Sequence, residues 1–239
     1  IQWTVSACAA VFGTAVFSSA YSRQQNLWVA VGQGATHNIA YTSNVAGAWT
    51  GVGGLTLTSA RTVTFAPSIP LWVIGGVLST GSTSILVTIN PSIQTPVAAT
   101  TQPFGTTGAI VNRCYYGGQG TTAPVFVCVA TPGTGSTGTI AWSSDGDTWT
   151  GLGTSIFSTA GFGVFYDIGS ALWVAAGQGT NQVAKSVNGK TWTAIATAPF
   201  TSAATVVYAP VSIANSLTRE MYPELVNEYK KRHVNKTLL

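Results

Sequence analysis

A repeated pattern of short apolar runs constrains the fold of this chain more than any other feature. Four similar segments begin at Leu27, Leu71, Val125 and Leu172, and their aromatic residues recur every 43 to 54 residues. The first segment opens with "LWVAVGQG" and the last with "LWVAAGQG". The runs are short and bounded by Gly, Pro, Asn or Ser, as β-strands are. The chain is therefore predicted to be a series of similar β-units.

Each unit contains enough runs for four strands. An upstream run such as "TVTFAP" precedes the repeated segment, and a run such as "TWT" closes it. Four short antiparallel strands in a unit of this length are typical of a β-propeller blade. We therefore predict an all-β fold, a β-propeller of about five four-stranded antiparallel blades or an arc of a larger propeller. The fifth blade would be divided between "QWT" at the start and "TVVYAP" near residue 210.

The chain divides by composition into two parts. Residues 1–210 carry the propeller repeats, whereas residues 211–239 are rich in charge. In this tail Pro223 and Glu224 suit the first turn of a helix, and Lys230, Lys231 and Arg232 suit its end. We expect a short helical C-terminal tail. It is either a solvated helix packed on its own propeller or a docking segment for a neighbouring subunit.

The low charge of the body excludes some classes of function. Charged residues make up 7% of the chain, but 46% hydrophobic residues and eight Trp indicate a folded core. The repeat region is nearly uncharged, so we expect no groove for nucleic acid. No apolar run is long enough to predict a membrane span. Because the sequence starts with Ile1, we expect that a signal peptide or another domain precedes it.

A tight turn precedes the closing strand of most units. Ser143, Asp145, Gly146, Thr148 and Trp149 form the pattern S/T-x-D-G-x-T-W in the third unit. The pattern resembles the Asp-box, the bacterial neuraminidase repeat, in which the box is a structural hairpin away from the catalytic centre. By this resemblance the structural turn residues are Asp145, Gly146 and Trp149, then Asn188, Gly189 and Trp192, and more loosely Asn44, Gly47 and Trp49. The second unit lacks the motif by sequence, with Pro96 in place of the closing aromatic residue.

The Asp-box propellers that this chain resembles include sialidases and other glycosidases, and the resemblance therefore raises hydrolysis as a candidate activity. Glycoside hydrolysis normally needs two placed carboxylates, or a Tyr nucleophile with an acidic partner. Outside the turn, the repeat region offers only Asp167. Arg23, Arg61 and Arg113 occupy different places in their repeats, and His37 is expected to be a solvated loop residue. We therefore predict no catalytic, cofactor-binding or metal-binding residue, and no cofactor.

The three cysteines, Cys8, Cys114 and Cys128, have no metal-binding spacing. Cys114 and Cys128 could face each other across a hairpin. We favour buried free thiols over a disulfide.

The composition favours a scaffold or recognition module. Charge-poor, Thr- and Gly-rich repeats resemble virion and fibre proteins of phages and large DNA viruses. We expect a non-catalytic structural or attachment module on a virion or extracellular surface, with other protein subunits as partners. The alternative is a secreted, lectin-like protein that binds glycans. Trp142 and Tyr41, which we expect to be exposed, are its candidate ligand contacts. A sialidase-like glycoside hydrolase is the least favoured reading.

Overall fold

The structure is a computed structural model, and it describes residues 11–53, 57–78, 84–105, 107–118, 123–195 and 201–206. The chain divides into two compact units, Ile1–Val206 and Val207–Leu239. All described residues belong to the first unit. The predicted helical tail and the two ends of the predicted fifth blade, at "QWT" and beyond Val206, lie outside the described residues.

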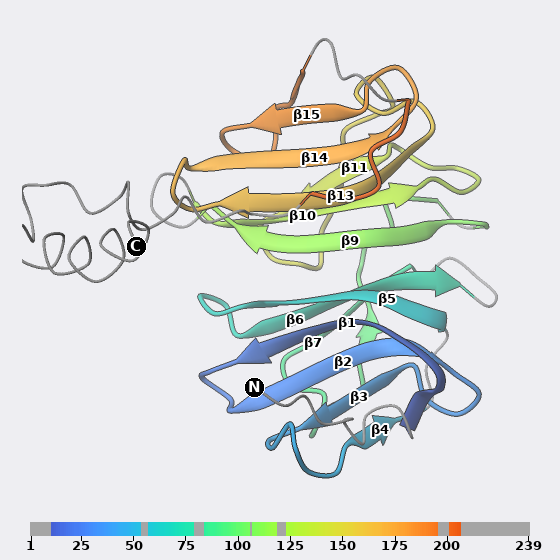
Figure 1. Cartoon of the computed structure of the whole chain (residues 1–239), viewed down its shortest axis with the longest axis vertical. Helices are drawn as coiled ribbons and strands as arrows, with labels where there is room; N and C mark the ends of the chain where they lie inside the picture. The colour runs from blue at the N-terminus through green and yellow to red at the C-terminus, as the bar shows by residue number, and fades with distance from the viewer. Residues whose placement is uncertain are drawn as a thin grey trace, which may run out of the picture. The chain divides into compact units, whose positions relative to one another are not determined.

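The strands of the first unit follow one another in four antiparallel sets of four, and a pairing between β6 and β9 joins the second and third sets into one eight-stranded sheet (Figure 1). The four sets are called sheets 1 to 4 below. Sheet 1 contains β1 (Gly13–Ser22), β2 (Leu27–Gly34), β3 (Ile39–Thr42) and β4 (Thr50–Val52). Sheet 2 contains β5 (Leu57–Ala66), β6 (Leu71–Leu78), β7 (Ile85–Thr88) and β8 (Val97–Ala98). Sheet 3 contains β9 (Ile110–Gly117), β10 (Val125–Thr131), β11 (Ile140–Ser143) and β12 (Thr150–Gly151). Sheet 4 contains β13 (Ala160–Asp167), β14 (Leu172–Gln178), β15 (Val183–Ser186) and β16 (Thr193–Ala194). The prediction of an all-β fold with antiparallel sheets is confirmed.

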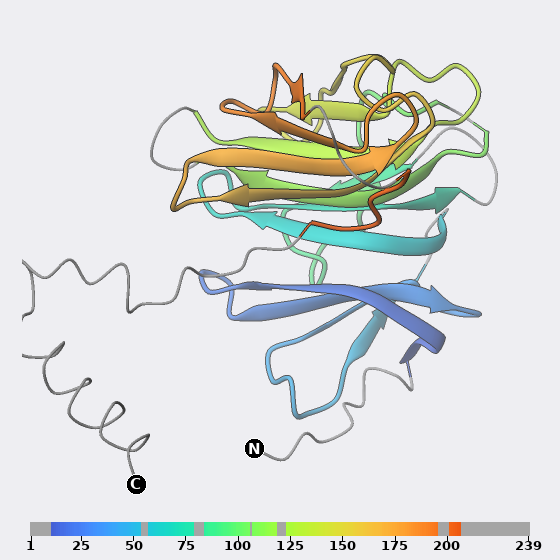
Figure 2. The same cartoon turned by 45° about the horizontal axis from the view of Figure 1, so that its top comes forward.

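The sheets pack face to face in chain order, and Figures 1 and 2 show this order from blue to orange. Successive side chains of a strand point to opposite faces of its sheet. The second strand of a sheet can therefore contribute to the apolar layers on both sides of it. Val29 packs between sheets 1 and 2, Val73 between sheets 2 and 3, and Val127 between sheets 3 and 4. The residues between these positions face the preceding sheet, as Trp72 and Trp173 do. Both of these side chains are fully buried.

The first strands of the four sheets share a β-bulge at the same place. Their pairing with the second strands skips one residue, namely Phe17 in β1, Arg61 in β5, Asn112 in β9 and Phe162 in β13. A bulge leaves the extra residue unpaired and redirects its side chain. The four residues therefore occupy equivalent positions on neighbouring first strands, although their side chains differ in chemistry.

Cys114 and Cys128 form a disulfide between β9 and β10. The two residues are direct cross-strand partners, and both are buried in the layer between sheets 2 and 3. The prediction of free thiols was therefore wrong for this pair. The equivalent cross-strand positions, Val63 and Ile74 in sheet 2, form an apolar pair instead.

Residues 201–206 run beside sheet 4. Ser202 forms an isolated antiparallel bridge with Gln178, the last residue of β14. The Ala203 N–H donates to the Gly177 carbonyl at 3.0 Å. An equivalent bridge joins Val77 of β6 to Ile110, where the first strand of the next sheet begins. Residues 201–206 thus approach sheet 4 as β9 approaches sheet 2.

Candidate functional site

The turn between β11 and β12 is built around the Asp145 carboxylate. One oxygen, Oδ1, accepts the N–H groups of Asp147 at 2.9 Å and Thr148 at 2.8 Å, and the Ser143 hydroxyl at 2.8 Å. The Ser143 hydroxyl oxygen in turn accepts the Gly146 N–H at 2.8 Å. Gly146 has a φ of +80°, and a Cβ there would lie 2.6 Å from a Leu71 methyl group. Asp145 therefore organises the turn, and only Gly fits beside it.

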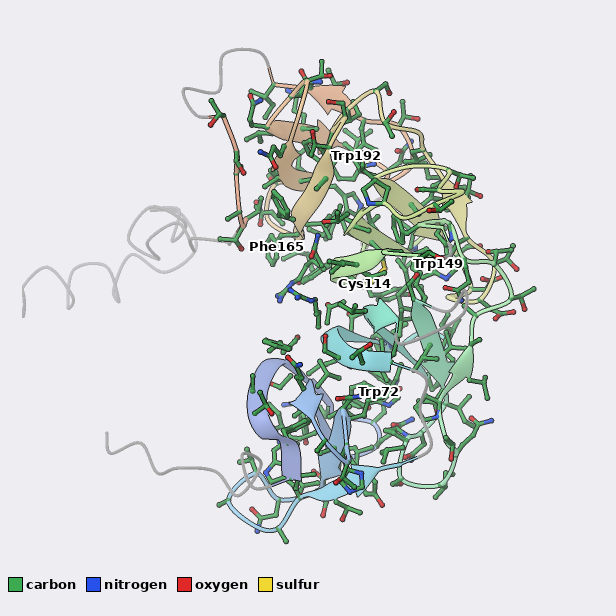
Figure 3. All side chains as sticks on the ribbon, turned by 90° about the vertical axis from the view of Figure 1, so that its right-hand side faces the viewer. Trp72, Cys114, Trp149, Phe165 and Trp192 are labelled. Atoms are coloured by element: carbon green, nitrogen blue, oxygen red, sulfur yellow. A yellow bond between two sulfur atoms is a disulfide. The ribbon has the colours of Figure 1, made fainter. Side chains whose placement is uncertain are left out.

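Trp149 joins this turn to the apolar layer between sheets 2 and 3. Its side chain is 6% exposed, and its indole N–H donates to the Gly146 carbonyl at 2.7 Å. Its backbone N–H donates to the Thr101 hydroxyl. Figure 3 shows Trp72, Trp149 and Trp192 in succession along the stack of sheets, one in each apolar layer. Trp149 thus links the turn of sheet 3 to sheet 2.

The fourth repeat reproduces the arrangement with an amide in place of the carboxylate. Asn188 Oδ1 accepts the N–H groups of Lys190 and Thr191, both at 2.9 Å. The Gly189 N–H donates to the Ser186 hydroxyl at 2.9 Å, and the Trp192 indole N–H donates to the Gly189 carbonyl at 3.0 Å. The turn therefore needs an oxygen acceptor at this position and does not need a negative charge.

The first repeat keeps only part of this arrangement. Asn44 Oδ1 accepts the Ala46 N–H at 3.1 Å, and the Gly47 N–H donates to the Asn44 carbonyl at 2.9 Å. The extra residue shifts Gly47 relative to the tryptophan. Trp49 is half-buried, and its buried indole N–H has no hydrogen-bond partner among the described residues.

The second repeat retains more of the turn than its sequence suggested. The Asn90 N–H donates to the Thr88 hydroxyl at 3.2 Å, and Asn90 Oδ1 accepts the Ser92 N–H at 2.9 Å. The hydroxyl-x-amide part of the motif is therefore present, and only the Gly and Trp are missing. Reading "TIN" as an equivalent of "SSD" could have found it. Pro96 is buried directly before β8.

Asp147 forms hydrogen bonds to the preceding sheet. Its two carboxylate oxygens accept the Thr100 N–H at 2.8 Å and the Thr100 hydroxyl at 2.6 Å. These bonds tie the sheet 3 turn to the segment that follows β8. The two acids of the turn therefore have different structural partners, because Asp145 binds within the turn and Asp147 binds across to sheet 2.

Asp167 and His37, the two remaining candidates for catalysis, both contact residues close by. Asp167 accepts the Ser170 hydroxyl at 2.6 Å and the N–H groups of Gly169 and Ser170 at 3.0 and 3.1 Å. The hydrogen bond from the Ser170 hydroxyl is the main reason that the pKa of Asp167 is lowered. His37 is half-buried rather than solvated, and its ring lies against Gly51 of β4. Its buried Nδ1 has no hydrogen-bond partner among the described residues.

The structure places the three arginines in two different settings. Arg23 is exposed in the turn between β1 and β2. Arg61 and Arg113 are also exposed, but they lie on the neighbouring first strands β5 and β9. The shared bulge that positions Arg61 was missed from the sequence. The first strands share no residue type at this position, so no motif could indicate it.

Tyr41 and Trp142, the candidate ligand contacts, are both half-buried rather than exposed. Tyr41 packs against the layer between sheets 1 and 2, and Trp142 packs against the layer between sheets 3 and 4. The Lys190 ammonium lies 4.2 Å from the centroid of the Trp142 ring. Both aromatic side chains therefore contribute to the contacts between sheets.

The described residues lack two kinds of feature, a cluster of metal ligands and a membrane-spanning helix. No group of three His, Cys, Asp or Glu side chains that could hold a metal ion occurs in this part of the chain. In the same residues, no helix has the length and apolar character to cross a membrane.

Comparisons with known proteins find distant likeness among solved structures. No family model matches the chain, and no curated protein matches it. Among solved structures, the GH74 enzyme of Niastella koreensis is similar over 75% of this chain, with 18% sequence identity and a TM-score of 0.49. This chain spans 25% of the length of that protein. A likeness at this level assigns neither a family nor an activity to the chain.

Proposed function

We propose that this protein is a non-catalytic β-propeller that serves as a structural or attachment module of a surface or virion-type assembly. The observation that carries the proposal is the use of its carboxylates. Asp145 and Asp167 bind backbone N–H groups of their own turns, and Asp147 binds Thr100 of the preceding sheet. In the described repeats, carboxylates act as turn formers and sheet connectors. Chemistry by paired acids would require oxygens that these hydrogen bonds already use.

Five blades are the form of the propeller that we favour. Residues 201–206 pair with sheet 4 at the position where β9, the first strand of sheet 3, pairs with sheet 2. On the opposite side, Tyr21 stacks on Trp28 with the ring centroids 4.8 Å apart. Tyr21 is 41% exposed, whereas its equivalent Tyr166 is 3% exposed beneath the preceding sheet. A fifth blade would cover the aromatic face of sheet 1 and remove its open edge. An experimental structure with an open stack of four sheets would contradict this closure.

The lectin-like alternative receives less support from the two aromatic residues. A sugar that stacks on an aromatic ring needs one free ring face. Trp142 and Tyr41 pack against adjacent sheets, and Trp142 also has the Lys190 ammonium over its ring. These contacts are those of side chains that stabilise the stack.

The proposal is tested by locating the protein in its source. Immunoelectron microscopy with antibodies against residues 11–206 is expected to label the surface of particles or cells. Labelling confined to soluble compartments would overturn the structural role. A panel of chromogenic glycosides provides the second readout, and we expect no hydrolysis. Turnover that disappears in an Asp167→Asn variant would overturn the non-catalytic assignment.

A further inference from the structure

Arg61 and Arg113 lie at the same level of two neighbouring parallel strands. Both β5 and β9 pair antiparallel with β6, so they run in the same direction. The Cys114 N–H donates to the Thr62 hydroxyl at 3.0 Å, which fixes the relative position of the two strands. Each arginine directly precedes one partner of this hydrogen bond. The two arginines therefore occupy adjacent backbone positions on β5 and β9, and both side chains are exposed.

The Arg61 side chain is held by a contact with sheet 1. Its guanidinium carbon lies over the Phe17 ring, 5.6 Å from the centroid. Phe17 is the bulge residue of β1, so the aligned bulges of two sheets bring these side chains together. Stacking on a ring uses a face of the planar guanidinium and leaves the N–H donors at its edge free to bind an anion. Phe17 is 44% exposed and provides an apolar surface beside these donors.

No carboxylate of the described residues is free to neutralise this pair. Asp145, Asp147 and Asp167 are the acids of this part of the chain, and each is engaged in the turn and loop hydrogen bonds described above. The next bulge residue, Asn112, is used structurally, since its amide donates to the Gly161 carbonyl at 2.8 Å and the Thr131 hydroxyl at 3.2 Å. The two arginines thus have the chemistry of a binding site, whereas Asn112 connects sheets 3 and 4.

We propose that Arg61, Arg113 and Phe17 form a docking site for an acidic peptide segment of a partner protein, with a carboxylate beside an apolar side chain. Each guanidinium would bind a carboxylate of the segment through paired N–H donors, and Phe17 would contact the apolar neighbour. This inference deepens the proposed function and rests on it for the choice of a polypeptide ligand. The site would bind an acidic partner although charged residues make up only 7% of this chain.

Binding of a short peptide to the full chain tests the site. The probe is a fluorescently labelled Gly-Glu-Phe-Glu-Gly peptide with blocked termini, and its control has Gln in place of Glu. Fluorescence anisotropy at low salt should show saturable binding of the acidic peptide and none of the control. Arg61→Gln and Arg113→Gln should each raise Kd about tenfold or more, the loss expected for a charge-assisted contact. Arg61→Lys should lose part of the affinity, because Lys keeps the charge but not the planar pair of donors.

Arg23→Gln is the matched control, since it removes the same charge from an exposed arginine outside the site. It should leave Kd unchanged, and thermal unfolding should show that all variants fold. An equal loss in the Arg23 variant would overturn the site in favour of general charge attraction. Absence of saturable binding, or binding of glucuronic acid in preference to the peptide, would overturn the polypeptide ligand. These results do not depend on where the protein resides, so they are distinguishable from failure of the microscopy test.

Discussion

The turns between third and fourth strands and the bulges of the first strands both recur in every sheet, but they differ in what is repeated. The turns repeat their chemistry, since a hydroxyl residue and an Asp or Asn bind the backbone in all four copies. The bulges repeat only their backbone geometry, with Phe17, Arg61, Asn112 and Phe162 as the extra residues. Repeated chemistry therefore marks positions that the fold needs. A repeated geometry with varied side chains offers positions where binding can be specific.

The largest expected effect concerns the tryptophan that closes the turn. Trp149→Ala should lower the free energy of unfolding by about 3–5 kcal/mol, because it empties a buried aromatic site and removes an indole hydrogen bond. Trp49→Ala is the matched variant and should have a clearly smaller effect, since Trp49 is half-buried. Denaturant titration measures both. Equal losses would show that the incomplete turn of sheet 1 contributes as much as the complete one.

The disulfide stabilises the strand that carries Arg113. Its removal in a Cys114→Ala/Cys128→Ala variant should lower stability by about 3 kcal/mol, as expected for a bond that closes a loop with a sequence separation of 14. Chemical unfolding with and without reductant measures the effect. Reductant should destabilise the native protein and leave the variant unchanged. The native protein could also be unfolded completely and refolded in reductant. A stability equal to that without reductant would then contradict the disulfide.

Removal of the acceptor in the turn should have an intermediate effect. Asp145→Ala should lower stability by about 1–2 kcal/mol, and Asn188→Ala by about 1 kcal/mol, because a charged acceptor forms stronger hydrogen bonds. Asp145→Asn should retain most of the stability, as the fourth repeat suggests. Denaturant titration of the three variants is the measurement. An Asn variant as unstable as the Ala variant would contradict an acceptor role.

The pH dependence of the same turn follows from the pKa of Asp145. Burial raises this pKa, but hydrogen bonds from the Thr148 N–H, the Ser143 hydroxyl and the Asp147 N–H outweigh it, and the pKa is lowered overall. The contribution of Asp145 is therefore present above the unfolded carboxyl pKa of about 3.9 and is lost as the pH falls through the lower folded value. The stability of Asp145→Asn should fall less than that of the native protein over this range.

The smallest expected effect is that of the cation over Trp142. Lys190→Gln should lower stability by about 0.5–1 kcal/mol through loss of the cation–π contact. Lys185→Gln is the control, because this exposed residue occupies the position in sheet 4 that Trp142 has in sheet 3. Thermal unfolding compares them. A loss of stability in Lys185→Gln as large as that in Lys190→Gln would contradict a specific role for the contact with the Trp142 ring.

The sequence allowed prediction of features that depend on local pattern. The all-β fold and the antiparallel order of the strands follow from apolar runs between turn residues, and Asp145 accepts backbone N–H groups within its own turn. Features that depend on packing between sheets were missed. Tyr41 and Trp142 looked exposed because the neighbouring sheet that contacts them cannot be read from their own strands. The Cys114–Cys128 bond depends on cross-strand register, and the aligned bulges depend on one unpaired residue in each first strand.

The central claim is that the turns serve the fold whereas the arginine pair at the first strands serves binding. Unfolding free energy and affinity for the acidic peptide, measured together on Asp145→Ala and Arg61→Gln, test it most directly. We predict that the Asp145 variant loses about 1–2 kcal/mol of stability and keeps the native Kd. The Arg61 variant should keep its stability and show a Kd raised about tenfold. A peptide affinity lost in the Asp145 variant and retained in the Arg61 variant would contradict the claim.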